Sequence, residues 1–246
     1  MVILLTPGKG VRASDTKTAM DSATRDARFV AHSDSWLLGG LEGGERKIAS
    51  GILESCPARL LPAGSRRIGD LAQAEVLLVE SGFLVVRASS PGARHVVVAE
   101  AGAGSILLAP SGREHLQALT DCWVTALPAF QLEGLLALPL VAATLLRGLE
   151  STLRRRQESA SYFGSVHHVD RVRRKLEQLG QEFGRVKPDG IRIEFPLSHD
   201  LLADMVASAR ETVTRSVDEL RRRGFVARDG HTYRLLVAPE ALDASG

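Results

Sequence analysis

Residues 209–226 read ARETVTRSVDELRRRGFV, and this stretch decides how the C-terminal part of the chain is expected to fold. The run has a helical pattern, and Gly224 is the expected stop. The predicted helix begins by displaying Arg210, Glu211 and Arg215 around small β-branched residues. Such a start is typical either of a solvated surface with ion pairs or of a helix that contacts the edges of base pairs. The neighbouring sequence decides between the two.

A shorter helix is predicted before this stretch and a hairpin after it. Ser198 is a candidate N-cap for a helix over residues 199–206, and a break at Ala207-Ser208 separates the two helices. Downstream, two short apolar runs flank Asp229-Gly230, a dipeptide that favours a tight hairpin turn. Helix, short turn, helix and hairpin together predict a winged helix-turn-helix. Upstream of it, residues 166–183 have a helical pattern and residues 191–195 a strand pattern.

The second helix of such a motif enters the DNA major groove, with its first residues at the base edges. There Arg210 or Arg215 can donate two hydrogen bonds to guanine, and Glu211 can accept one from cytosine. The alternative for Glu211 and Arg215 is a surface ion pair one helical turn apart. A further set of side chains is expected to contact phosphate oxygens, which position a protein on DNA without reading its sequence. That set is Ser208, Thr212, Thr214, Arg222 and Arg228.

The first half of the chain predicts antiparallel β structure. Short runs rich in Val and Leu are separated by Gly, Pro and Ser, a spacing typical of a sandwich or barrel. A short helix is expected within residues 36–54, before the first strand, and residues 1–35 are expected to form an N-terminal extension. The predicted strands are 58–62, 75–80, 82–88, 94–99, 105–109 and 122–127.

A long helix is predicted between these two parts, from about residue 129 to residue 163. Its apolar stripe is about 27 Å long at 1.5 Å per residue. This stripe can pack on the chain's own barrel or on the same helix of a second chain. Because the stripe is narrow and rich in leucine, the second arrangement is favoured. The residues expected at this dimer contact are Leu138, Ala142, Leu145 and Leu149.

Residues 197–226 contain Leu-Ser-x-x-x-Leu-Ala, then Arg-Glu-Thr-Val-Thr-Arg-x-x-x-x-Leu and Gly-Phe-Val. This pattern resembles the Crp/Fnr superfamily of bacterial transcription regulators, and residues 116–128 are similar to the last barrel strand of that family. The resemblance covers about residues 55–236. It implies an α+β fold with a jelly-roll barrel of the cyclic-nucleotide-binding type. It also implies a homodimer on a two-fold-symmetric operator, with Arg210, Glu211 and Arg215 as base readers.

The sequence departs from the family pattern in two places. The family turn has Gly, a small residue and Ser before the arginine, whereas Ala207, Ser208 and Ala209 stand here. Members that bind cyclic nucleotides carry a Gly-Glu pair and an Arg-Ser or Arg-Thr in the barrel. This chain lacks that Gly-Glu, and Arg113 is followed by Glu114, whose charge would repel a phosphate. Cyclic AMP is therefore not expected to bind in the family manner, and the effector site is unknown.

Composition limits the other classes of function. The chain has 246 residues, 44% of them hydrophobic, which is enough for two domains with sizeable cores. The net charge is only +2, so basic residues must be locally concentrated to bind nucleic acid. Cys56 and Cys122 form no Cys-x-x-Cys pair and are expected to be buried small hydrophobes, with redox sensing as the alternative. The lack of a disulfide framework favours the cytoplasm.

Enzymes and membrane proteins are disfavoured by two further observations. Ser198-His199-Asp200 has the residue types of a catalytic triad, but consecutive helical positions point about 100° apart and cannot form a relay. The most apolar window, residues 135–146, contains Pro139 and is shorter than the roughly 20 residues that span a bilayer. No enzymatic activity, metal, cofactor or membrane partner is expected.

The sequence thus predicts a cytoplasmic, dimeric, sequence-specific transcription regulator. The expected partners are double-stranded DNA and a second copy of the chain, with RNA polymerase and an unidentified small-molecule effector as further candidates. One alternative is a constitutive DNA-binding protein whose barrel only supports the dimer or contacts other proteins. A more distant alternative is a small-molecule-binding or enzymatic barrel. The predicted domains are residues 1–35, 36–128, 129–163 and 164–246.

Overall fold

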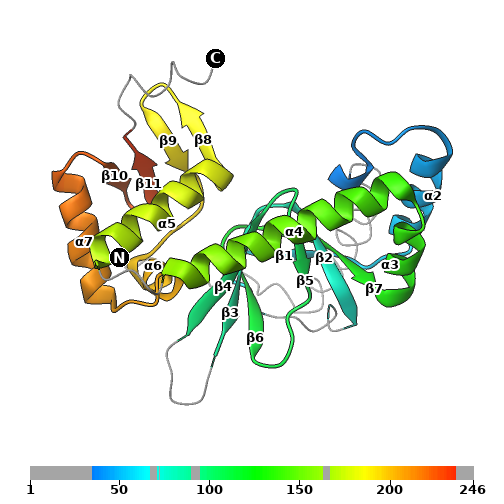
Figure 1. Cartoon of the computed structure of the whole chain (residues 1–246), viewed down its shortest axis with the longest axis horizontal. Helices are drawn as coiled ribbons and strands as arrows, with labels where there is room; N and C mark the ends of the chain where they lie inside the picture. Colours follow the sequence, from blue (N-terminus) through cyan, green and yellow to red (C-terminus); the bar gives the residue numbers. More distant parts are fainter. Residues whose placement is uncertain (1–34, 67–70, 72, 90–94, 163–166, 237–246) are drawn as a thin grey trace, which may run out of the picture.

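The computed structural model describes residues 35–66, 71, 73–89, 95–162 and 167–236, with only the backbone described for 158–162. The predicted N-terminal extension therefore lies almost wholly outside the described residues. The chain forms a β-sheet half and a winged helical half, and helix α4 (Pro139–Tyr162) reaches from the far end of the first toward the second (Figure 1). The α+β prediction is confirmed.

Seven strands of the first half form two antiparallel sheets, which is the jelly-roll type of arrangement that the sequence predicted. One sheet has the order β1-β7-β2-β5 and the other β4-β3-β6. Apolar side chains from both sheets fill the space between them, including Leu77, Leu84 and Leu107, each fully buried. Strand β6 was not predicted, because His115 and Gln117 on its outer side interrupt the apolar run. The strands are β1 Ala58–Leu61, β2 Ala74–Ser81, β3 Phe83–Ala88, β4 Val96–Gly102, β5 Ile106–Leu108, β6 Glu114–Ala118 and β7 Cys122–Pro128.

Short helices close one end of this sandwich. The 3-10 helix η1 (Trp36–Leu38) and helix α2 (Gly43–Glu54) pack with α3 (Ala129–Leu136) and with α4 around a second apolar cluster. Leu37, Leu53 and Leu135 are buried there. The short helix predicted within residues 36–54 is therefore present as two pieces.

The single long helix predicted from residue 129 is divided. α3 ends at Leu136, α4 begins at Pro139, and the two axes are bent by 118°. Proline is well tolerated at the start of a helix, and it disfavours helical geometry in the residue before it. Among the described residues, no single helix is long and apolar enough to cross a membrane, although the bent α3–α4 pair passes the same test by length and composition.

The predicted apolar stripe of α4 packs on the chain's own sheets. Leu145 is 1% exposed within the single chain and lies in the cluster with Ile106 and Leu127, so it has no surface left for a second chain. Leu138 and Leu149 also pack against this cluster, and Ala142 is half-buried. Leu138, Leu145 and Leu149, three of the four residues predicted for the dimer contact, thus pack on the chain's own sandwich.

The physical reason is that polar and small residues belong to the buried stripe of α4. Gly148 lies so close to strand β5 that a Cβ there would be 2.4 Å from Cδ1 of Ile106. One turn further on, the Thr152 hydroxyl donates to the carbonyl oxygen of Ile106 at 2.5 Å. The buried face therefore runs through Val141, Leu145, Gly148 and Thr152, and a hydrophobicity pattern gives no weight to the last two.

The second half is the predicted winged helix-turn-helix. Three helices pack on a four-stranded antiparallel sheet of order β10-β11-β9-β8. The Ser198 hydroxyl caps α6 by accepting from the Leu201 amide at 3.1 Å, as expected. Strand β8 was not predicted. The elements are α5 His168–Phe183, β8 Gly184–Lys187, β9 Gly190–Ile193, α6 His199–Met205, α7 Arg210–Arg222, β10 Val226–Asp229 and β11 Thr232–Leu235.

One hydrophobic cluster spans the two halves. Phe83 and Val85, on the outer face of the β4-β3-β6 sheet, belong to the same cluster as the helices of the winged half. The ring of Phe83 stacks on that of Phe195 with centroids 3.6 Å apart. Two ion pairs cross the same boundary: Lys175 to Glu100 at 2.6 Å, fully buried, and Arg87 to Asp204.

Candidate nucleic-acid interface

Helix α7 buries one face and presents the other to solvent. Val213, Val217 and Leu220 are at most 1% exposed and anchor the helix on the core of the winged half. The predicted base readers Arg210, Glu211 and Arg215 are all exposed, on the first turns of the helix. The three predicted side chains are therefore all accessible on the first turns of α7.

The environments of the two arginines differ. Arg210 Nη1 lies 3.5 Å from Asp200 Oδ2, so its charge is partly offset by α6. Arg215 Nε donates to the backbone carbonyl of Glu211 at 3.4 Å, which is a contact to the backbone and not to the carboxylate. Arg215 and Thr212 line a groove of about 590 Å³ between α7 and the start of α5. The guanidinium of Arg215 is thus accessible to a ligand that enters this groove.

Two of the predicted phosphate contacts are engaged within the chain. Ser208 is 5% exposed, and its hydroxyl lies 3.1 Å from Nδ1 of His168. This inward hydroxyl corrects the prediction that Ser208 contacts phosphate. The Thr214 hydroxyl donates to the Arg210 carbonyl at 3.0 Å and lies 2.8 Å from Nδ1 of His199. Burial, and then the charge of Arg228, lower the pKa of His199, so its ring is neutral at pH 7.

Thr212, Arg222 and Arg228 remain on the surface. Thr212 is half-buried, while the exposed Arg222 forms an ion pair with Glu219. Arg228 lies over the ring of Tyr233, with 5.7 Å from its guanidinium carbon to the ring centroid. Burial raises the pKa of Tyr233 to about 12, so the phenol stays protonated beside the arginine. That these three side chains contact phosphate stays a prediction.

The turn between α6 and α7 carries strain. Ala207 has φ of +46°, a left-handed conformation in which the Cβ of an L-residue is crowded. The N-cap of α7 is Ala209, and its side chain makes no capping hydrogen bond. Both departures from the family turn therefore have a structural consequence, since the glycine and the serine of that pattern would relieve the strain and cap the helix.

Replacing Ala207 with glycine is expected to stabilise the protein by about 0.5–1 kcal/mol. Glycine adopts positive φ without steric cost, and Ala207 is exposed, so the substitution removes little packing. Thermal unfolding monitored by circular dichroism measures the change. Ala63→Gly is the control, since Ala63 is exposed and is not among the non-glycine residues with positive φ. A melting temperature of Ala207→Gly at or below that of the control would contradict the assignment of strain.

A row of arginines that sequence reasoning missed lies on the outer face of the wing sheet. Arg185 pairs with Arg192, and Arg192 with Arg234, directly across three adjacent strands. Like charges directly opposite one another destabilise a sheet. Arg234 forms an ion pair with Asp189, and Arg185 lies 3.6 Å from Glu194. Of the three arginines, only Arg192 has no ion-pair partner among the described residues. The row could not be predicted from the sequence, because it depends on strand β8.

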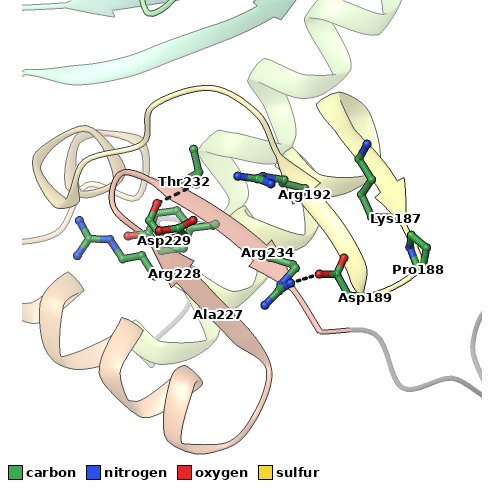
Figure 2. Close-up of a pocket in the computed structure, with 10 residues that line it drawn as sticks. Lys187, Pro188, Asp189, Arg192, Ala227, Arg228, Asp229, Thr232 and Arg234 are labelled. Atoms are coloured by element: carbon green, nitrogen blue, oxygen red, sulfur yellow. Dashed lines mark hydrogen bonds and ion pairs between the residues drawn. The ribbon is translucent and has the colours of Figure 1, made fainter.

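Arg192 and Arg234 of this row line a hollow of about 500 Å³, in which Arg192 and Lys187 lie on the β8–β9 side and Arg228 on the other (Figure 2). A second hollow, of about 600 Å³, lies at the end of α7 and includes Arg221 and Arg222. The two hollows share Ala227 and Arg228. A basic track therefore continues from the end of α7 across the wing sheet.

The sandwich offers no nucleotide-binding cassette of the family type among the residues that the structure describes. Arg113 is exposed in the loop before β6, and Glu114 lies 3.8 Å from Arg156 of α4. Both cysteines are buried, and burial raises the pKa of Cys56 to about 11, so its reactive thiolate is scarce at pH 7. The prediction that they serve as small buried hydrophobes is confirmed.

Known regulators resemble this chain in sequence. The model of the Crp-like helix-turn-helix domain matches residues 141–245. A global nitrogen regulator of Synechococcus elongatus is 28% identical over 167 residues, which is 65% of this chain and 75% of that protein. The chain is therefore similar to regulators of the Crp/Fnr superfamily, and its residues 141–245 carry the match to the Crp-like helix-turn-helix domain. A CRP-like cAMP-activated global transcriptional regulator of Mycobacterium tuberculosis is 29% identical over 92 residues, or 37% of this chain and 41% of that protein.

Solved structures agree on the fold of this Crp/Fnr-type chain. A CRP-family transcriptional regulator from Thermus thermophilus superposes with a TM-score of 0.60 at 22% identity, over 76% of this chain and 95% of that one. The c-di-GMP-responsive global regulator CLP of Xanthomonas campestris gives 0.61 at 19% identity, over 80% and 100%. These structures support the fold, while the helix-turn-helix match and the sequence relatives support a DNA-binding transcription regulator of the Crp/Fnr type.

Proposed function

We propose that this regulator binds a two-fold-symmetric operator as a homodimer and reads bases with Arg210, Glu211 and Arg215. The observation that carries this proposal is the open cluster of these three side chains at the start of α7, backed by a buried face. A regulator of this kind would act without catalysis, in the cytoplasm, where DNA lies. RNA polymerase and a small-molecule effector remain candidate partners.

Selection of bound DNA from a random library by the purified protein tests this function. The expected result is an enriched consensus with two-fold symmetry and half-sites about one DNA turn, roughly 34 Å, apart. Enrichment without added ligand would favour the alternative of a constitutive DNA-binding protein or of a ligand that releases it. A library that stays unenriched both alone and in the presence of cell metabolites would contradict sequence-specific binding.

The surface that we propose for the second copy is the solvent face of α4, not the stripe predicted from the sequence. Leu146 and Leu153 are 62% and 51% exposed, and their seven-residue spacing places them on one side of the helix. Phe130 and Leu136 of α3 are also exposed. Large exposed apolar side chains that are contiguous mark interaction sites in proteins. A symmetric partner would bury each of them against its counterpart.

Replacing Leu146 with glutamate is expected to weaken dimer formation about 100-fold or more. Each of two copies loses an apolar side chain worth about 1.5–3 kcal/mol when buried, and each introduces a charge at the contact. Sedimentation equilibrium measures the dissociation constant. Leu60→Glu is the matched control, because Leu60 is 43% exposed on strand β1, at the opposite edge of its sheet from strand β5, which contacts α4. Equal dissociation constants for the two variants would show that α4 does not form the dimer contact.

We propose further that the arginine row of the wing sheet contacts phosphates that flank the operator. Replacing Arg192 with glutamine is then expected to lower the slope of log K against log salt by about 0.9 per protomer, the value of one phosphate contact. The effect should occur on a long duplex and be lost on one trimmed to the symmetric core. Arg113→Gln, an exposed arginine on the sandwich, is the control. An unchanged slope on the long duplex would contradict flanking contacts.

A further inference from the structure

A hollow between the two halves is not used by the proposed DNA contacts. Its volume is about 370 Å³, within the range of small-molecule sites. The sandwich contributes Arg66, Arg87 and Gln117, and the winged half contributes Ser198, Asp200 and His231. It lies on the outer face of the β4-β3-β6 sheet, outside the interior in which family members hold nucleotides. Any molecule bound there would touch both halves at once.

The sandwich wall of this hollow is positively charged. Arg87 donates to Gln117 Oε1 at 2.8 Å and forms an ion pair with Asp204, and its side chain is 11% exposed. Arg66 is exposed and has no ion pair with any other residue that the structure describes. The neighbouring His115 has a lowered pKa, through burial first and then through the charges of His95, Arg87 and Arg66. Arg66 is thus the arginine of this wall whose charge no described carboxylate offsets.

Hydrogen-bond donors line this hollow on both the sandwich side and the winged side. Because Gln117 Oε1 accepts from Arg87, the amide NH₂ of Gln117 is left to donate. Ser198 uses its oxygen as an acceptor for the Leu201 amide, so its hydroxyl hydrogen is available. The carbonyl of His231 accepts from the Leu197 amide at 2.7 Å, which fixes the wing turn beside the hollow, and the residue is exposed. Asp200, the carboxylate in the lining, lies 3.5 Å from Arg210.

We propose that this hollow binds the carboxylate or phosphate group of a small metabolite, held by Arg66 and by donors from both halves. Arg66 supplies the charge from the sandwich, and Ser198 and His231 supply contacts from the winged half. The ligand would thereby stabilise the docked arrangement of the two halves. Its effect on DNA binding rests on the proposed function, whereas the binding itself does not.

Titration with inorganic phosphate at constant ionic strength, with chloride as the replacement salt, tests the binding on the full chain without DNA. Amide NMR shifts are the readout. Saturable shifts are expected at Arg66, Gln117 and His231. Arg66→Gln and His231→Gln should each weaken binding tenfold or more, whereas Arg113→Gln, which removes the same charge elsewhere on the sandwich, should have no effect.

Shifts that stay linear, or equal affinities in Arg66→Gln and Arg113→Gln, would overturn the site. If Arg66→Gln weakened phosphate binding and His231→Gln did not, the site would not lie between the two halves. A non-specific duplex tests whether the phosphate comes from DNA instead: if the duplex shifts these amides and free phosphate does not, the hollow belongs to the DNA interface and the proposal fails. For regulation, saturating phosphate should change operator affinity at least fivefold in the unmodified protein and not in Arg66→Gln. Equal changes in both would refute the coupling.

Discussion

Arg215→Ala is expected to weaken operator binding about 30-fold or more and to relax specificity at one position of each half-site. A bidentate contact between arginine and guanine is worth about 1–3 kcal/mol of discrimination, and a symmetric dimer makes it twice. Arg215 is the better of the two arginines to replace, because Asp200 partly offsets the charge of Arg210. Arg215 donates only to a backbone carbonyl within its own helix, among the residues that the structure describes.

The measurement is the dissociation constant for the selected operator and for its single-base variants. Arg223→Ala is the matched control: Arg223 is exposed at the opposite end of the same helix and is bonded to Glu219 at 2.8 Å. The control should weaken all sequences alike, by a small factor. If Arg215→Ala also weakened every sequence alike, Arg215 would be a phosphate contact and not a base reader.

The winged half was predictable because its signals are local. Ser198 caps a helix as serine commonly does at that position, and Asp229-Gly230 marks the hairpin turn. Strands of the sandwich were predictable where several consecutive residues are apolar, as in β2 and β3. Strands β6 and β8 were not predicted, because their outward-facing polar residues make the apolar pattern too short to recognise as a strand. Local sequence thus predicts elements with a strong periodic signal and misses those that tertiary pairing creates.

The candidate site was predicted only in part, for a related reason. The three residues at the start of α7 were predicted from their place in the helix-turn-helix, and the structure leaves all three exposed. The inward hydroxyl of Ser208 depends on His168, 40 positions away, which no local pattern gives. The arginine row depends on the register of three strands. The contact face of α4 depends on Gly148 and Thr152, whose roles appear only once β5 lies against them.

The contact between the two halves could not be predicted from the sequence either. Breaking an ion pair within it is expected to have the largest effect on stability. Lys175 is 0% exposed, and its ammonium lies 2.6 Å from Glu100, which is 2% exposed. The same ammonium donates to Gln178 at 3.0 Å. Removing one partner of a buried ion pair leaves an uncompensated charge and costs about 3–5 kcal/mol. Lys175→Met is therefore expected to lower the free energy of unfolding by about that amount.

A double-mutant cycle separates this ion pair from the packing around it. Adding Glu100→Gln to Lys175→Met removes the stranded charge, so the double variant is expected to recover most of the loss, measured by urea unfolding. Glu177→Gln, which breaks the exposed pair with Arg173 on the same helix, is the control and should change stability by about 0.5 kcal/mol or less. A double variant no more stable than Lys175→Met would mean that Lys175 acts through packing. Recovery would instead identify a charge pair that fixes the winged half on the sandwich, since a buried pair contributes specificity of arrangement more readily than net stability.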